Sequence, residues 1–177
     1  MMNEVLRNLE ERRSIRKYTD QPVEKEKIDA VIRAGLYAAS GKASQDTIIL
    51  CITQKELRDE LAEDNRKIAG MSESMDPFYG AQVVLAVLAD KSVPTHVYDG
   101  SLVLGNMMNA AASLGLGSCW IHRAKQEFEM DKYQKLLKTL DIKGDYEGIG
   151  HLILGYPAEE NPRPAPRKEG RVYIIDK

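Results

Sequence analysis

The chain carries the sequence Glu11-Arg12-Arg13-Ser14-Ile15-Arg16-Lys17-Tyr18, with four cations and one hydroxyl within six residues. If this segment is extended, Arg12, Ser14 and Arg16 share one side. Ile15 then faces the core. Guanidinium groups offer paired donors to phosphate oxygens, and a serine hydroxyl adds one more. The segment therefore predicts a site for a phosphorylated cofactor, although taken alone it also fits a solvated basic turn.

Hydrophobic patterns outside this segment predict an α+β fold. Five helices are expected at 3–9, 28–39, 57–61, 99–116 and 133–140, and strands at 48–52, 83–89, 118–121 and 149–154. The strands at 48–52 and 83–89 are continuous apolar runs, which is typical of strands covered on both faces. Because helices and strands do not alternate strictly, we expect a mixed sheet with helices on both sides.

Three segments stand out within what the length predicts to be a single domain, 1–177. The helix at 99–116 is apolar nearly all round, so we expect it to be buried centrally or against a partner chain. The pattern loosens at 65–80, which fits either a flap over a pocket or an irregular surface loop. In the flap interpretation Phe78 and Tyr79 face a substrate. The tail at 157–177 begins with a proline-rich stretch, so it is expected to be extended.

Composition excludes several classes of function. The net charge of −2 gives no general attraction to nucleic acid. No apolar run approaches the ~20 residues of a membrane span, and the N-terminus lacks a signal-peptide pattern. Cys51 and Cys119 show no metal or redox spacing and are expected to be small buried residues. We therefore expect a soluble cytoplasmic protein.

Motifs for catalysis by the protein itself are missing from the sequence. Gly41-Lys42-Ala43-Ser44 lacks the first glycine and the final hydroxyl of a P-loop, and the glycines at 115 and 117 do not form a dinucleotide fingerprint. The three histidines share no metal spacing: His96 is expected on a surface loop and His151 at the start of a buried strand. No metal site is predicted. A bound cofactor is therefore expected to carry the chemistry.

Four blocks, in order, resemble the nitroreductase family of flavin-dependent NAD(P)H oxidoreductases. They are Arg12 to Tyr18, Ala38-Ala39-Ser40-Gly41 with Gln45, Gly115 to Ile121, and Leu154-Gly155-Tyr156-Pro157 with Pro166-Arg167-Lys168. The resemblance implies an α+β fold, a mostly antiparallel sheet and an intertwined homodimer. It also implies FMN at the dimer interface, with NAD(P)H as electron donor.

Site residues follow from the resemblance, block by block. Arg12, Arg13 (through its backbone), Ser14 and Arg16 would hold the FMN phosphate, ribityl chain and pyrimidine edge. Arg167 would close on the phosphate, whereas the alternative for Arg167-Lys168 is a disordered basic tail. Ala39, Ser40, Gly41 and Gln45 would reach the partner's flavin, and Trp120, Ile121, His122 and Arg123 would run along the ring. Arg16 would stabilise the reduced ring.

The implied reaction passes hydride from NAD(P)H to FMN and then, by ping-pong exchange, to a nitroaromatic, quinone or similar acceptor. The chain departs from the family pattern at Ala43, Asp46 and Thr47, where the family commonly has Asn, Pro and Trp. These departures leave open an alternative: a flavin-binding or flavin-sensing protein with little reductase activity. A flavin-consuming or dehalogenating relative is a third interpretation.

Overall fold

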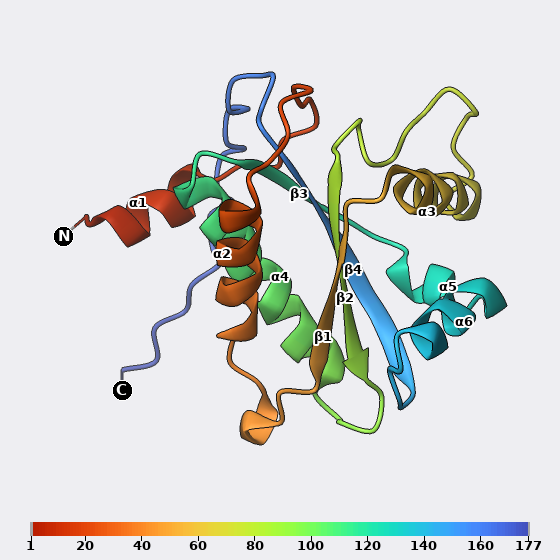
Figure 1. Cartoon of the computed structure of the whole chain (residues 1–177). Coiled ribbons are helices and arrows are strands. Elements are labelled where there is room, and N and C mark those ends of the chain that lie inside the picture. The colour runs from red at the N-terminus through yellow and green to blue at the C-terminus, as the bar shows by residue number, and fades with distance from the viewer. Residues whose placement is uncertain (1, 177) are drawn as a thin grey trace.

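The computed structural model describes residues 2–176, in which a four-stranded sheet lies between two layers of helices (Figure 1). The strand order is β1-β2-β4-β3, and all three strand pairs are antiparallel. The strands are β1 Thr47–Ile52, β2 Val83–Asp90, β3 Gly117–Ile121 and β4 Tyr146–Gly155. The predicted α+β fold with helices on both sides of a sheet is confirmed.

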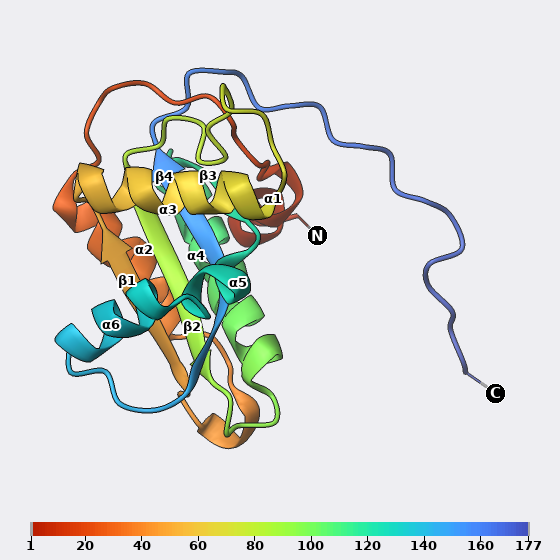
Figure 2. The same cartoon turned by 90° about the vertical axis from the view of Figure 1, so that its right-hand side faces the viewer.

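Strand β2 shows why the sheet is covered on both faces. Its residues 83–89 are all buried, and alternate side chains enter two separate apolar clusters. One cluster packs beneath α2 Lys25–Leu36 and α4 His96–Ser113. The other packs beneath α3 Lys55–Ile68, α5 Ala124–Phe128 and α6 Asp131–Thr139 (Figure 2). This two-sided burial makes β2 and β4 the centre of the molecule.

Helix α1, Glu4–Glu11, lies outside these layers. The Asn3 side chain caps it by accepting from the Leu6 N–H at 2.9 Å, as expected of an asparagine at this position. No residue of α1 is buried. Its apolar side chains, which the sequence places on one helix face, are exposed: Val5, Leu6 and Leu9.

Several sequence-based expectations are wrong. β1 is an edge strand and is only partly buried, although Ile49 packs against one apolar cluster and Ile48 and Leu50 against the other, so its coverage on both faces is incomplete. Cys51, expected to be buried, is exposed, whereas Cys119 is buried. His96 begins α4 instead of lying on a loop, and its Nδ1 is 2.8 Å from the Val93 carbonyl oxygen. His151 lies within β4 and not at its start. The five-residue helix α5 was not predicted.

Helix α4 is covered on one face only. Val103, Leu104 and Met107 are buried against the sheet, whereas Tyr98 is 71% and Leu102 49% exposed. Central burial is therefore excluded for this helix. Among the described residues, no helix is long and apolar enough to cross a membrane.

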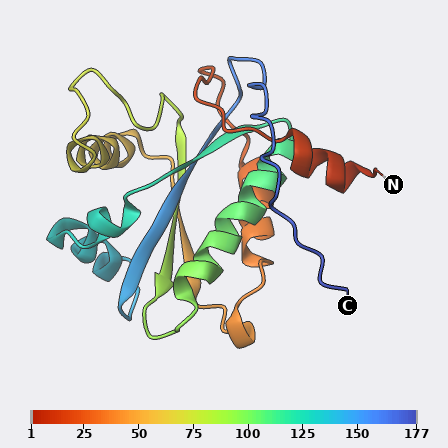
Figure 3. The same ribbon diagram turned by 180° about the vertical axis from the view of Figure 1, so that it is seen from behind.

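Between residues 156 and 176 the chain forms no helix and no strand beyond an isolated β-bridge at Pro157. From Pro157 onward it runs past the first layer of helices and away from the body of the molecule (Figures 2 and 3). Residues 172–175 are all apolar and 81–92% exposed.

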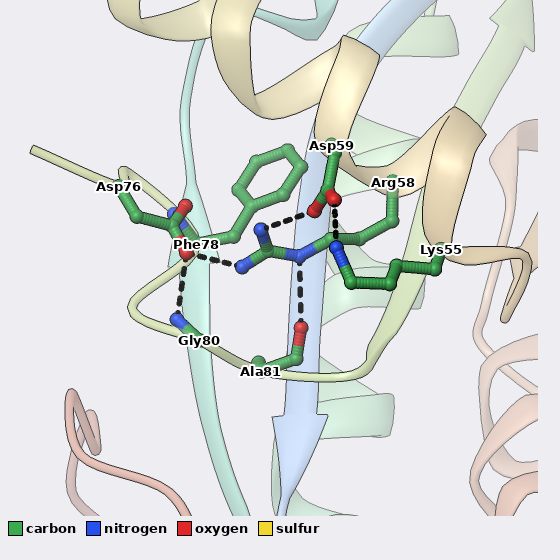
Figure 4. Close-up of polar contacts among 7 residues, drawn as sticks. All are labelled: Lys55, Arg58, Asp59, Asp76, Phe78, Gly80 and Ala81. Carbon is green, nitrogen blue, oxygen red and sulfur yellow. Dashed lines mark hydrogen bonds and ion pairs between the residues drawn. The ribbon is translucent and has the colours of Figure 1, made fainter. Parts of the chain in front are cut away.

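The segment 65–80 is anchored to the body of the molecule. Its first residues, through Ile68, belong to α3. Further on, Arg58 donates to the Ala81 carbonyl at 3.0 Å and pairs with Asp76 (Figure 4). The Asp76 carboxylate in turn accepts from the backbone N–H groups of Phe78 and Gly80, both at 2.8 Å. Residues 76–81 therefore form a latched turn.

Phe78 is a core residue. Its side chain is 0% exposed, its ring lies 5.5 Å from that of His151, and the Arg58 guanidinium lies 5.5 Å from its centroid. The expectation that Phe78 faces a substrate is wrong. The aromatic side chain fills the space between the sheet and α3.

We expect Arg58→Met to release the latched turn, because it removes charge-assisted hydrogen bonds from a largely buried guanidinium. The free energy of unfolding should fall by about 1.5–3 kcal/mol. Amide hydrogen exchange should accelerate at Phe78 and Gly80. Lys55→Met is the matched control, since its ammonium pairs with Asp59 at an exposed position and should change stability by about 0.5 kcal/mol or less. Unchanged exchange in Arg58→Met would contradict the latch.

Candidate functional site

The basic segment after α1 is fixed against the start of β3. Ser14 and Ser118 form a parallel β-bridge, and the Ile15 N–H donates to the Ser118 carbonyl at 3.0 Å. The Ile15 side chain is buried against Gly117, where an added Cβ would lie 2.9 Å from it. The predicted inward orientation of Ile15 is therefore confirmed.

The segment that follows β4 lies beside this basic segment. The Ala158 N–H donates to the Lys17 carbonyl, and the Thr19 N–H to the Tyr156 carbonyl, both at 2.9 Å. The Tyr18 hydroxyl donates to the Ile15 carbonyl at 2.6 Å. Burial raises the pKa of Tyr18, so its phenol remains a donor at neutral pH. These bonds bring the C-terminal segment next to the N-terminal one.

A pocket rich in guanidinium groups forms where the two segments meet. Its charged and hydroxyl-bearing residues are Glu10, Arg12, Arg13, Ser14, Arg163 and Arg167. The Arg12 Nη1 is buried and has no hydrogen-bond partner within residues 2–176. Four guanidiniums with one carboxylate suit a phosphate monoester, which accepts paired N–H donors.

Two of these arginines also bond to the main chain nearby. Arg13 Nη1 donates to the Glu10 and Arg12 carbonyls, both at 2.6 Å, at the end of α1. Arg167 Nη2 donates to the Ala165 carbonyl at 2.6 Å. Arg12 and Arg167 nevertheless line one pocket, as expected if both chain ends serve one ligand.

Arg16 lies outside this pocket. Its backbone N–H donates to Glu159 Oε1 at 2.8 Å, and its guanidinium carbon lies 6.0 Å from the centroid of the Tyr79 ring. Both side chains retain exposed surface. Arg16 and Tyr79 therefore form a separate polar and aromatic corner of the candidate site. Glu159 gave no signal in the sequence.

A second group of predicted site residues lies at the opposite end of the molecule (Figures 1 and 2). Ala39, Ser40 and Gln45 line a pocket between α2 and α4. The Gln45 N–H donates to Ser40 Oγ at 3.1 Å, and the Gly41 N–H donates to Asp99 Oδ1 at 3.0 Å. Within a single chain, these residues and the guanidinium pocket are therefore separate sites.

Of the positions that depart from the family pattern, Ala43 and Asp46 lie in the same loop and Thr47 begins β1. Lys42, Ala43 and Gln45 have φ values of 55°, 56° and 49°, in the left-handed region. Asp46 is buried, and its Oδ1 accepts from the Ser44 hydroxyl at 2.7 Å. The carboxylate is turned into the loop, where Ser44 satisfies one of its oxygens.

The third predicted group is the end of β3 and the turn after it. The Trp120 indole lies over Gly150, where an added Cβ would be 2.2 Å from Nε1. Ile121 pairs with His151 in the sheet, and the His122 side chain is exposed. Arg123 has a φ of 86° and is the N-cap residue that precedes α5. Beneath this turn lie buried polar residues that the sequence did not indicate: Asn65 and Glu127.

The sequence matches a known protein family and known relatives. The family model described as "Nitroreductase family" matches residues 9–156. The chain is 29% identical to the FMN reductase [NAD(P)H] of Bacillus subtilis over 181 residues, covering 92% of this chain and 69% of the relative.

Solved structures show the same similarity. A nitroreductase with bound FMN from Bacteroides fragilis has a TM-score of 0.89 at 25% identity, covering 99% of this chain and 100% of that one. An FMN-dependent nitroreductase from Clostridium difficile has a TM-score of 0.78 at 28% identity, covering 96% and 98%. Together with the matched family model, these likenesses agree with the fold and the blocks described above. The chain belongs to the nitroreductase family.

Proposed function

We propose that this protein is an FMN-dependent NAD(P)H oxidoreductase with the FMN phosphate in the guanidinium pocket. The observation that carries the proposal is the buried Arg12 Nη1, which has no hydrogen-bond partner among residues 2–176 and lies in a pocket that Arg167 also lines. The relatives support it, since they include an FMN reductase [NAD(P)H] and a nitroreductase with bound FMN. When bound, FMN supplies hydride exchange, accepting from NAD(P)H and delivering to a nitroaromatic, quinone or similar small acceptor.

The chain's own residues bind and orient in this proposal. Arg12, Ser14 and Arg167 hold the phosphate. Arg16, with its exposed guanidinium beside Tyr79, supplies positive charge near the pyrimidine edge and stabilises negative charge there. Backbone groups of the turn at His122 and Arg123 border the ring, and Tyr79 borders the acceptor. Loop 39–45 completes the site of a partner subunit.

An absorption spectrum followed by anaerobic titration tests the function. We expect purified protein to bind FMN and turn yellow, and NADH or NADPH to bleach it without oxygen. A yellow protein that neither nicotinamide bleaches would favour the alternative of a flavin-binding protein with little reductase activity. Protein that stays colourless after FMN is added would end the proposal.

We expect Arg12→Ala to weaken FMN binding by about 1.5–3 kcal/mol, because it removes charge-assisted contacts with the phosphate. Arg167→Ala should act in the same direction. If both guanidiniums contact one phosphate, the losses should not add in the double variant. Fluorescence titration of FMN measures each affinity. Arg7→Ala, on the exposed side of α1, is the charge-matched control and should bind normally.

Homodimer formation is part of the proposal. The exposed apolar residues of α1, α4 and the tail offer a surface that a second copy would cover. We expect a chain truncated after Gly170 to dimerise more weakly, because it loses the four exposed apolar residues at 172–175. Light scattering against concentration measures the dissociation constant. The double variant Arg171→Ala/Asp176→Ala keeps those residues and is the control; equal dimerisation by the truncated and full chains would contradict this role.

A further inference from the structure

Three polar side chains are buried together next to the turn that joins β3 to α5. Asn65 of α3 is 2% exposed, and Glu127 of α5 and His151 of β4 are both 0% exposed. They lie against the apolar cluster on the α3, α5 and α6 side of the sheet. Burial of such groups is unfavourable unless they are hydrogen-bonded, so their partners define what they do.

The three side chains form one connected network that reaches the turn. His151 Nε2 lies 2.6 Å from Glu127 Oε2, and the Asn65 amide nitrogen lies 3.3 Å from the same oxygen. The Asn65 nitrogen also donates to the His122 carbonyl at 2.8 Å. Because a carbonyl only accepts, the amide must present its nitrogen to His122. Glu127 supplies a second acceptor that favours the same amide orientation.

The turn itself is strained and is held at both of its carbonyls. Arg123 has a φ of 86°, which is unfavourable for a residue with a side chain. The Glu127 backbone N–H donates to the Arg123 carbonyl at 3.1 Å, while Asn65 holds the His122 carbonyl. Strained backbone of this kind persists where the surrounding structure over-determines it. Glu127 therefore contacts the turn through its backbone, and its side chain acts on the turn through Asn65.

The network leaves buried polar atoms without hydrogen bonds, so it is not the arrangement that would maximise stability. Glu127 Oε1 and His151 Nδ1 are buried without a hydrogen-bond partner in the described part of the chain. Leaving such atoms unsatisfied is destabilising, and an apolar cluster of the same volume would avoid that loss. The His151 ring is also fixed by Phe78 and Phe128, whose centroids lie 5.5 Å and 6.3 Å away.

We propose that Asn65, Glu127 and His151 are positioning residues that set the backbone of the His122–Arg123 turn for flavin binding. The inference rests on the proposed function, in which this turn borders the ring. The three side chains do not touch the cofactor. They hold the main-chain groups that do, so the loss of one should change how FMN is bound.

Asn65→Ala tests the positioning role directly. We expect its FMN affinity to fall by about tenfold, because the His122 carbonyl loses the hydrogen bond that holds it. The flavin's midpoint potential should also shift, because the ring's hydrogen-bonding environment changes. Tyr133→Phe is the matched control: it removes the buried Tyr133–Asp64 hydrogen bond of 2.5 Å at the same helix without touching the turn. Loss of stability in both variants with unchanged FMN affinity and potential would overturn the proposal.

Two variants at Glu127 separate positioning from packing. Glu127→Gln keeps an oxygen that accepts from Asn65 and His151, so we expect FMN binding close to that of the unmodified protein. Glu127→Leu fills similar space without an acceptor and should bind FMN as weakly as Asn65→Ala. Equal binding by the Gln and Leu variants would contradict the role of the acceptor.

A measurement on the unmodified protein does not depend on whether the variants fold. In ¹H–¹⁵N spectra the Asn65 side-chain amide should shift when FMN is added. The Gln134 amide, which donates to the Phe128 carbonyl at 2.5 Å on the same side of the sheet, should not. If FMN binds and the Asn65 signal does not move, the positioning proposal is wrong while the proposed function stands. If FMN does not bind at all, the proposed function fails and the positioning role fails with it.

Discussion

The bond between the Ile15 N–H and the Ser118 carbonyl fixes the geometry of the candidate site. It attaches a charged segment to the start of a buried strand, where arginines would not otherwise be held in place. Ile15 supplies the apolar contact that the neighbouring guanidiniums cannot, and Gly117 leaves room for it. Because the attachment is made by backbone and an apolar side chain, the charged groups remain available for a ligand.

Backbone hydrogen bonds also bring distant parts of the chain to one pocket. The central strand β4 ends beside the basic segment. The residues that follow it, Tyr156 and Ala158, form backbone hydrogen bonds with Thr19 and Lys17. The proline-rich stretch that follows is irregular, and its Arg163 and Arg167 line the same pocket as Arg12. Electrostatic repulsion among these guanidiniums disfavours the arrangement unless an anion offsets it. In the proposed function the FMN phosphate is that anion.

Sequence patterns correctly predicted features that follow from hydrophobic periodicity. They failed for features that depend on which elements become neighbours in the folded chain. Alternation identified the inward side of Ile15, and the long apolar run identified β2. A similar run at 48–52 did not reveal that β1 is an edge strand, because hydrophobicity cannot specify a strand's neighbours. The prediction for Phe78 was wrong because its neighbours in the sequence are mostly polar, which indicated an exposed segment. Nothing in the sequence indicated that Arg58 anchors this turn. Glu127 and His151 are 24 residues apart on different elements, so no spacing signalled their pairing.

The loop at 39–46 is the part of the candidate site that the proposed homodimer would have to bring into place. Lys42, Ala43 and Gln45 adopt left-handed φ values at a cost of roughly 1–2 kcal/mol each, yet the loop lies far from the guanidinium pocket of its own chain. An asparagine, common in the family at the position of Ala43, tolerates this conformation better than alanine does. The loop therefore relies on its tertiary contacts, such as the Gly41–Asp99 hydrogen bond, to keep its shape. In the proposed homodimer this loop would complete the site of the partner subunit, and the exposed apolar residues of α1, α4 and the tail would form the contact surface.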